Sequence, residues 1–356
     1  MKKVIIVFAI LLVLLIVVAG GAFAWYTNAL KPVDTFGEEA VVLEIPEGTG
    51  ISGISKILEE KGVIRNADAC KMYCKIAKVG NLQAGKYSFE EAKSVPEIIA
   101  KIASGDVLTD EIQITFIEGK NMRWYAKAIA EKTINSEEEV LNLLASEEYI
   151  DSLIEKYWFL TDEIKDEDIY FPLEGYLLPD TYTFENAEVS PETIFNVILN
   201  FTDKFLSKYK DDFTYSVHQT LTLASMAEME GKSTEDRSEI IGVFLNRIDK
   251  GMSLGSDVTT YYAFGVDMAK NDLTVKQLNT YNPYNTRGPN MEGKIPIGPI
   301  CNPSRSAIEA TLTPTQTDAL YFVADKTGKV YFTKSNDEHS EIISKLKSEG
   351  KWYVYE

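Results

Sequence analysis

The chain has very little histidine and very little cysteine. Of its 356 residues only two are histidine, His218 and His339, and they lie far apart. This argues against a zinc site or a Ser-His-Asp triad. The three cysteines cannot supply a disulfide framework, and Cys70 and Cys74, one helical turn apart, are predicted to be small core residues. No glycine-rich phosphate loop occurs either. We therefore expect no metal and no cofactor.

Positive charge is also scarce. The chain has 36 lysine and arginine residues against 54 aspartate and glutamate residues, which gives a net charge of −18. A surface this acidic repels phosphate backbones. Nucleic acid is therefore excluded as an expected partner.

Long hydrophobic runs are absent except for one at the N-terminus. Residues 4–25 contain no charged side chain, and these 22 positions match the roughly 20 that a membrane-spanning helix needs. Lys2 and Lys3 precede the run, so the positive-inside rule predicts a cytoplasmic N-terminus and an extracytoplasmic chain from about residue 28 onward. Residues 22–24 also resemble a signal-peptide cleavage site. We favour an uncleaved single-pass anchor, because the apolar core is long for a signal peptide.

The first half of the chain indicates small units that mix strands and helices. Residues 41–45 alternate as a strand does, residues 51–58 follow helical spacing, and residues 83–89 and 95–103 are predicted as a strand and a helix. A weak echo occurs 71 residues later, where residues 112–116 form a predicted strand and Glu118-Gly119 matches Glu47-Gly48. This suggests a repeated strand–turn–helix unit. An acidic, helical stretch follows at residues 133–170.

The second half is predicted to be mainly helical, with a terminal hairpin. Expected helices cover residues 191–209, 221–230, 236–250 and 337–348, and the expected hairpin strands are residues 319–324 and 330–333. Loops are expected at residues 173–182, 256–262, 281–288 and 296–303. Together with the first half, this pattern predicts an α+β fold.

One predicted helix ends in a chemically informative pair of acids. The run from Leu221 to Glu230 is apolar apart from small polar residues and two glutamates, Glu228 and Glu230, and Gly231 stops it. Two residues apart, these carboxylates point in different directions, so at most one can face a given cleft. A carboxylate at a helix C-terminus feels the negative end of the macrodipole, and partial burial adds desolvation. Both favour the protonated form that a general acid needs, although a solvated terminal glutamate is the simpler interpretation.

The loops that follow suit a carbohydrate cleft. They are rich in tyrosine, asparagine, threonine and aspartate, which can read neutral sugars through hydroxyl and amide groups and aromatic faces. Tyr261, Tyr281 and Tyr284 are equally compatible with the core. Acid–base cleavage of a glycosidic bond would need neither a metal nor a cofactor.

With these motifs in place, the chain resembles the membrane-anchored endolytic murein transglycosylases, the YceG-like or MltG group. Six segments match in the family's order: EGYLLPDTYTF (174–184), LASMAEME (223–230), GVFLNRIDKGMSLGSDVT (242–259), YNTR (284–287), PIGPICNPS (296–304) and ALYFVADKTGKVYFT (319–333). The resemblance implies LysM-like βα modules near the membrane and a C-terminal lysozyme-like, YceG-type catalytic domain. It also implies cleavage within peptidoglycan strands and a link to the synthases that elongate them.

The resemblance makes Glu230 the catalytic acid. It implies substrate-binding or supporting roles for a further set of residues, namely Glu228, Asp257, Thr259, Tyr284, Asn285 and Thr286, with Asn285 expected in the cleft. Val258 follows the loop aspartate where the family usually has proline. Arg287 ends the YNTR loop where tyrosine is common. Both departures concern loop shape and substrate preference.

The predicted organisation has four parts. Residues 1–27 form the cytoplasmic tip and membrane anchor, 38–106 a LysM-like module, 107–185 a second βα module with the acidic helical connector, and 186–356 the catalytic transglycosylase domain. The predicted reaction cleaves the bond between N-acetylmuramic acid and N-acetylglucosamine, gives 1,6-anhydromuramyl ends and limits strand elongation. The alternative is a non-catalytic wall-binding scaffold for a peptidoglycan synthase.

Overall fold

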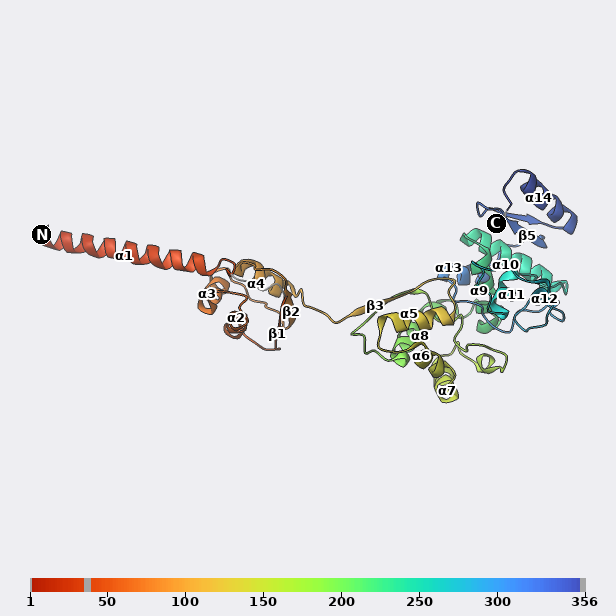
Figure 1. The fold of residues 1–356 in the computed structure, drawn as a ribbon, viewed down its shortest axis with the longest axis horizontal. Coiled ribbons are helices and arrows are strands. Elements are labelled where there is room, and N and C mark those ends of the chain that lie inside the picture. Colours follow the sequence, from red (N-terminus) through yellow and green to blue (C-terminus); the bar gives the residue numbers. More distant parts are fainter. Residues whose placement is uncertain (1, 35–39, 353–356) are drawn as a thin grey trace. The chain divides into compact units, whose positions relative to one another are not determined.

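The computed structural model describes residues 2–34 and 40–352 (Figure 1). It divides into two compact units, Met1–Asp110 and Glu111–Glu356. The predicted start of the first module at residue 38 lies outside the described residues. The division of the second unit at residue 185 stays a prediction.

The N-terminal unit begins with the expected long apolar helix. Helix α1 covers Lys2–Ala29, and within it Ile5–Ala29 is long and apolar enough to cross a membrane. Its large side chains are exposed, for example Phe8 at 70% and Val18 at 69%. A helix with an unburied apolar surface of this length suits a lipid environment. Its orientation across a membrane stays a prediction.

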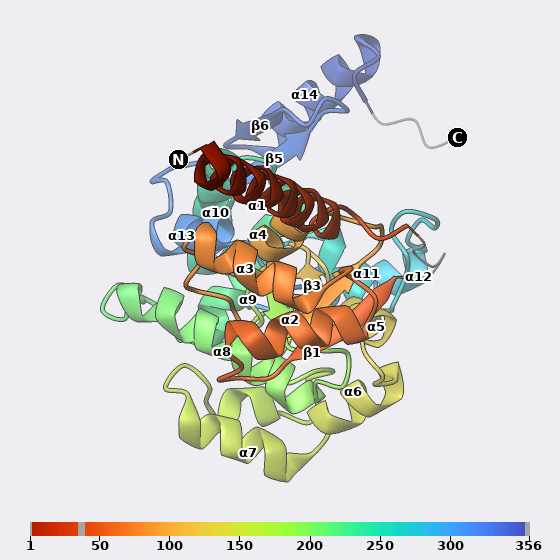
Figure 2. The same cartoon turned by 90° about the vertical axis from the view of Figure 1, so that its left-hand side faces the viewer.

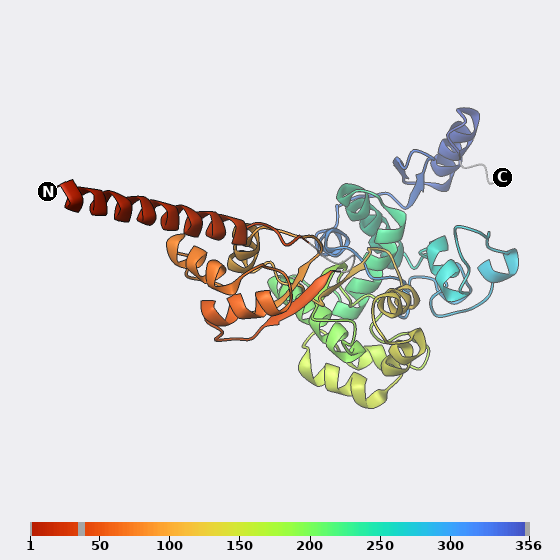
Figure 3. The ribbon, with the colours of Figure 1, turned by 60° about the vertical axis from the view of Figure 1, so that its left-hand side comes forward.

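The rest of this unit has the order strand, two helices, strand, helix. Its elements are β1 (Val41–Ile45), α2 (Ile51–Glu60), α3 (Ala67–Ile76), β2 (Gly85–Phe89) and α4 (Val95–Ser104). Strands β1 and β2 pair antiparallel, with Val41 opposite Phe89. Helices α2 and α3 lie side by side (Figure 3). Cys70 and Cys74 are buried in this core, which confirms their predicted structural place.

The second unit opens with a similar arrangement. It contains β3 (Ile112–Phe116), α5 (Met122–Lys132), α6 (Glu137–Leu144), α7 (Glu147–Lys156), a 3₁₀ turn η1 (Asp162–Lys165) and β4 (Asp180–Phe184). Strand β3 starts 71 residues after β1, and each strand is followed by a turn glycine in the left-handed region, Gly48 (φ 76°) and Gly119 (φ 72°). The predicted echo is therefore present in the structure.

One predicted loop contains a strand instead. Residues 173–182 were expected to be a loop, but β4 begins at Asp180 and pairs antiparallel with β3, so that Ile112 lies opposite Phe184. The side chains of Tyr182 and Phe184 enter the core while alternate residues stay exposed. The partner strand lies more than 60 residues earlier, so this pairing has no local signal.

The remaining helices build the C-terminal part of this unit. They are α8 (Pro191–Leu206), the 3₁₀ turn η2 (Ser207–Tyr209), α9 (Val217–Glu230), α10 (Thr234–Asp249), α11 (Asp257–Ala263), α12 (Val275–Leu278) and α13 (Arg305–Leu312). The expected loop at residues 256–262 was wrong, because α11 occupies it. Its β-branched residues Val258, Thr259 and Thr260 are weak helix formers, and packing against α9 stabilises it instead.

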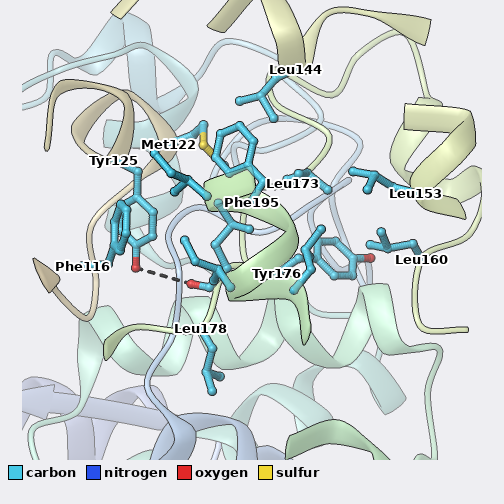
Figure 4. Packing of buried hydrophobic residues seen from close by; sticks show 14 of the residues in the cluster. Phe116, Met122, Tyr125, Leu144, Leu153, Leu160, Leu173, Tyr176, Leu178 and Phe195 are labelled. Atoms are coloured by element: carbon cyan, nitrogen blue, oxygen red, sulfur yellow. Dashed lines mark hydrogen bonds between the residues drawn. The ribbon is translucent and has the colours of Figure 1, made fainter. Parts of the chain in front are cut away.

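A large apolar cluster joins the parts of this unit (Figure 4). It runs from Ile114 on β3 to Leu221 and Ala224 on α9, without a break at residue 185. Within it Tyr125 donates a hydrogen bond to the carbonyl oxygen of Leu177 at 3.4 Å. The start of α9 is thus anchored in a core whose first residue, Ile114, lies more than 100 positions earlier.

The chain ends in the expected hairpin and helix (Figure 2). Strands β5 (Tyr321–Ala324) and β6 (Val330–Thr333) pair antiparallel, and α14 (Asn336–Ser348) packs against both. Arg247 of α10 attaches the hairpin by donating to the carbonyl oxygen of Leu320 at 2.6 Å.

Candidate active site

Helix α9 is buried along most of its length and becomes partly exposed again over its last three residues. It begins after Ser216, whose side chain accepts a hydrogen bond from the backbone N–H of Gln219 in a capping box. Residues 220–227 are buried, and residues 228–230 are partly exposed. The helix ends at Glu230 as predicted, because Gly231 adopts an extended conformation (φ −111°, ψ 140°).

Glu230 lies in an environment that favours its protonated form. Burial is the largest cause of a raised pKa for this carboxyl, and the nearby charge of Asp257 raises the pKa further. Two groups act in the opposite direction: the Ser256 hydroxyl, which donates to Oε1 of Glu230 at 2.6 Å, and the positive charge of Arg287. The carboxyl therefore keeps its proton to higher pH than an ordinary glutamate.

Ser256 contacts the candidate acid directly but was not predicted as a site residue. It occupies the N-cap position of α11, but its hydroxyl makes no cap bond and is directed to Glu230 instead. Two threonine hydroxyls accept from or donate to its backbone: Thr286 Oγ1 accepts from the Ser256 N–H at 2.9 Å, and Thr259 Oγ1 donates to its carbonyl oxygen at 2.7 Å. The sequence does contain a signal that could have drawn attention to this position: a serine directly before an aspartate is typical of the start of a helix.

Asp257 and Arg287 form an ion pair close to Glu230. Their side chains are 52% and 43% exposed, respectively. A pair this exposed contributes little to stability. Its effect on Glu230 is electrostatic, and because the two charges shift the pKa in opposite directions they partly cancel.

Glu228 is directed away from Glu230 and is held by other groups. Its side chain is 8% exposed and pairs with Arg237 of α10 at 2.6 Å. Its second oxygen accepts from the backbone N–H of Ser304 at 3.0 Å and from the Ser304 hydroxyl at 2.5 Å. Since Ser304 caps α13, the Glu228 carboxylate ties three helices together. The two glutamates diverge as the helical spacing predicts.

A cleft of about 1140 Å³ opens beside the end of α9. Met229, which lies between the two glutamates, and Val258, which follows Asp257, both line it. Glu230 is not among the residues that line the cleft, but its chain neighbour Met229 is, and so is Val258, which lies two residues after the hydrogen-bond partner of Glu230, Ser256. Six aromatic side chains contribute to the walls: Trp124, Tyr170, Phe171, Tyr261, Tyr262 and Phe264.

A second buried carboxyl supports the cleft walls. Glu174 is 1% exposed and accepts hydrogen bonds from the backbone N–H of Met122 at 3.0 Å and the hydroxyl of Tyr262 at 3.1 Å. Asn302 donates to its other oxygen at 3.3 Å. Burial raises the pKa of Glu174 to about 8. This carboxyl therefore joins α5 to α11 and was not singled out from the sequence.

With this geometry established, the comparisons with known proteins are decisive. The model of the YceG-like family matches residues 43–345. The chain belongs to the YceG-like family. This match covers most of both units.

Characterised relatives share most of this YceG-like chain. It is 36% identical over 330 residues to a protein of Bacillus subtilis (strain 168) named endolytic murein transglycosylase, covering 92% of this chain and 90% of that one. A protein of the same name from Streptococcus pneumoniae serotype 2 is 31% identical over 350 residues, and there the match covers 62% of the relative. A crystal structure of a yceG-like protein from Listeria monocytogenes aligns with a TM-score of 0.61 at 37% identity, covering 86% of this chain and all of that one.

The predicted site residues of the YceG-like chain do not all face the cleft. Thr259, Tyr284, Asn285 and Thr286 are fully buried and line no part of it. Asn285, which was expected in the cleft, instead donates to the backbone oxygens of Gln277 and Thr280 and accepts from Thr260. These side chains shape the loops that carry Ser256 and Arg287.

The three tyrosines whose place was left open have different surroundings. Tyr284 is in the core, where its ring centroid lies 4.8 Å from that of Tyr170. Tyr261 lines the cleft, and Tyr281 is 55% exposed without lining it. The aromatic residues Trp124 and Phe171 of the cleft were missed, because nothing local distinguishes them from core positions.

Proposed function

We propose that this chain is an endolytic lytic transglycosylase. It cleaves the bond between N-acetylmuramic acid and N-acetylglucosamine within peptidoglycan strands, leaves 1,6-anhydromuramyl ends and so limits strand elongation. Membership of the YceG-like family and relatives named endolytic murein transglycosylase support this function. The observation that carries it is a single partly buried carboxyl, Glu230, with a raised pKa beside an aromatic-lined cleft.

Glu230 acts first as an acid and then as a base. Its proton goes to the glycosidic oxygen as the bond from that oxygen to C1 of the muramyl sugar breaks. The resulting carboxylate takes the proton of the muramyl C6 hydroxyl, whose oxygen forms the new bond to C1. Water is not consumed, and Glu230 ends protonated again. Such a dual role requires a pKa near ambient pH, and burial at the helix end provides the upward shift.

A second carboxylate is not needed for this route. Glycosidases that use water or a covalent intermediate employ two carboxyl groups. Glu228 is bound to Arg237 and Ser304, and Asp257 is paired with Arg287, so neither carboxylate is free as the structure stands. In this proposal Ser256 holds Glu230 in position and stabilises its charged form after proton transfer.

We further propose that the enzyme is anchored in a membrane, which the long apolar helix α1 supports. Helix α1 anchors residues 1–27 with the N-terminus in the cytoplasm, and the catalytic domain of residues 186–356 acts outside the cell membrane. The strand–helix–helix–strand order with antiparallel β1 and β2 supports a LysM-like module over residues 38–106. Residues 107–185 form a second βα module with the acidic connector. Peptidoglycan synthases are proposed partners.

The decisive test is the fate of the cut ends. The detergent-solubilised chain of residues 1–356 and its Glu230→Gln variant are incubated with uncrosslinked glycan strands, and products are identified by mass spectrometry. We expect anhydromuramyl ends from the parent chain and a loss of rate of at least about 100-fold in the variant, as for removal of a general acid. Undiminished product from Glu230→Gln would rule out this assignment.

A matched control and two alternative outcomes sharpen the experiment. Glu341→Gln makes the same change at an exposed helical position on α14 and should leave the rate unaltered. Reducing ends instead of anhydro ends would indicate a hydrolase and make Asp257 or Glu228 the second carboxylate. A parent chain that binds strands but releases no product would support the scaffold alternative, which the named relatives do not favour.

A further inference from the structure

One wall of the cleft carries two cations. Lys120, in the turn after β3, and Arg123, in the first turn of α5, both line it. Both residues are exposed, and within residues 2–34 and 40–352 neither forms an ion pair. The chain as a whole has 18 more acidic than basic residues. Two cations that line one cleft without a carboxylate partner among the described residues therefore stand out against the acidic balance of the chain.

The acid that lines the same cleft interacts only weakly with Lys120: the hydrogen bond from Lys270 is the largest of the causes that lower the pKa of Asp267, and the charge of Lys120 is the smallest. Asp267 also lines the cleft, but its carboxylate is paired with Lys270 at 2.9 Å. Lys120 and Arg123 thus leave an excess of positive charge facing the cleft. An anionic group entering it would meet these side chains first.

The backbone under the two cations is firmly held. The N–H of Gly119 donates to the carbonyl oxygen of Asn302 at 3.0 Å, and the N–H of Asn302 donates to that of Lys120 at 3.0 Å. The buried carboxyl of Glu174 fixes the N–H of Met122, the residue before Arg123. The guanidinium of Arg123 lies 5.1 Å from the ring centroid of Phe171, another cleft residue. Stacking of this kind orients an arginine while its N–H groups stay available.

We propose that Lys120 and Arg123 form a subsite for the carboxylates of the stem peptides that muramyl residues carry. This rests on the proposed function and specifies its substrate as peptide-bearing strands rather than bare glycan. Stem peptides bear free carboxylates, whereas the sugars of the strand are neutral. Arginine binds a carboxylate through paired N–H groups and lysine as a point charge. The aromatic walls then contact the sugars.

The test compares three lipid-free substrates: peptide-bearing strands, the same strands with their carboxyls amidated, and strands stripped of peptides whose newly freed lactyl carboxyls are amidated as well. For the parent chain of residues 1–356, we expect the KM to rise on the order of fivefold when carboxylates are amidated or peptides removed, as expected for exposed charge pairs. For the Lys120→Gln/Arg123→Gln variant, we expect this ratio of KM values to fall to about one. Added salt should reduce the ratio for the parent chain.

The control removes the same amount of charge from positions of α5 that lie outside the cleft. Lys127→Gln/Lys132→Gln changes two exposed lysines of α5 that do not line it, and should keep the KM ratio of the parent chain. A parent chain indifferent to amidation, or a cleft variant that keeps the ratio, overturns the subsite. If amidated peptide-bearing strands are still preferred over stripped strands, the enzyme contacts the peptide chain and not its charge. This result also overturns the subsite.

A binding measurement separates the subsite from the reaction. The Glu230→Gln chain, with and without the Lys120 and Arg123 substitutions, is titrated with the same three substrates by calorimetry. A preference for free carboxylates that the two substitutions abolish supports the subsite even if no chain cleaves glycan, in which case only the proposed function fails. If the Glu230→Gln chain binds all three substrates equally while the parent chain still cleaves strands, the subsite is overturned and the proposed function stands.

Discussion

At the scale of single residues, two glutamates that lie two positions apart have surroundings that favour opposite charge states. Glu230 is partly buried and its side chain accepts a hydrogen bond from a neutral hydroxyl, that of Ser256, so burial remains the largest influence and raises its pKa. Glu228 has an arginine and a serine as partners, which stabilise its charge. The helical spacing predicts that they diverge. It does not predict which one meets the arginine.

The Ser256 hydroxyl should tune the acid. It donates to Glu230 and so favours the charged form. In Ser256→Ala this stabilisation is lost, and the pKa of Glu230 should rise further. Because the acid works while protonated, the alkaline limb of kcat/KM against pH should move to higher pH. The measurement is the pH profile of strand cleavage.

The control for this prediction is Ser344→Ala, an exposed serine of α14 whose hydroxyl bonds only within its own helix. Its profile should match that of the parent chain. An alkaline limb that stays fixed or moves to lower pH in Ser256→Ala would show that the hydroxyl does not stabilise the charged acid.

At the scale of elements, prediction succeeded where local signals are strong and failed where pairing is distant. Strands β1 and β3 lie where alternation predicts them, and α9 ends at the expected glycine. Strand β4 and helix α11 were missed. The first is specified by a partner strand far away in sequence, and the second has weak helix formers and gains its stability from α9 and from Thr286.

The contacts of Glu228 with Arg237 and Ser304 should stabilise the packing of α9, α10 and α13. In Glu228→Ala, two donors of Ser304 and the guanidinium of Arg237 lose their carboxylate partner, while the guanidinium keeps its bonds to the carbonyl oxygen of Gly231 and the hydroxyl of Ser306. We expect the free energy of unfolding of the second unit to fall by about 3 kcal/mol, as for a broken buried ion pair. Denaturant unfolding followed by circular dichroism measures it.

Glu131→Ala is the matched control, because it removes one partner of an exposed pair with Lys127. Its cost should stay below about 0.5 kcal/mol. If Glu228→Ala were as stable as this control yet inactive, Glu228 would belong to the reaction and not to the packing.

At the scale of the whole molecule, charge is distributed unevenly. The chain is strongly acidic, yet its cleft contains an unpaired lysine and arginine, and a buried neutral carboxyl, Glu174, holds the cleft walls together. Family membership covers both units, from residue 43 to residue 345. The structure thus combines one apolar helix suited to a membrane with an extensive folded part that carries the candidate site.

Glu174 should make stability depend on pH. Its pKa is about 8 in the folded chain against an ordinary 4.5, so between these values the folded state holds a proton that the unfolded state has released. The stabilisation is complete below about pH 4.5 and is lost as the pH rises through about 8. The difference in unfolding free energy between the parent chain and Glu174→Gln should therefore shrink from pH 5 to pH 9.

Thermal and denaturant unfolding at both pH values checks this, and the difference between the two chains cancels groups that they share. A difference that does not change with pH would mean that Glu174 is charged in the folded protein throughout this range.

The sequence by itself determined the features that depend on near neighbours. These are the apolar run of residues 4–25, the periodicity of the main helices, the strands that alternate, and a helix that ends in an acid before Gly231. The six ordered motifs were sufficient to indicate the family that the comparison then established.

The resemblance of the sequence already marked Glu230 as the candidate acid, and only the tertiary structure decided which groups surround each of the two carboxyls. Ser256 lies 26 residues after Glu230, and Ser304 lies 76 residues after Glu228. Desolvation and hydrogen bonding act through space, so groups this distant in the chain set a pKa that no local pattern contains. The cleft is likewise a product of packing, because its walls come from segments as far apart as Gly119 and Ile300.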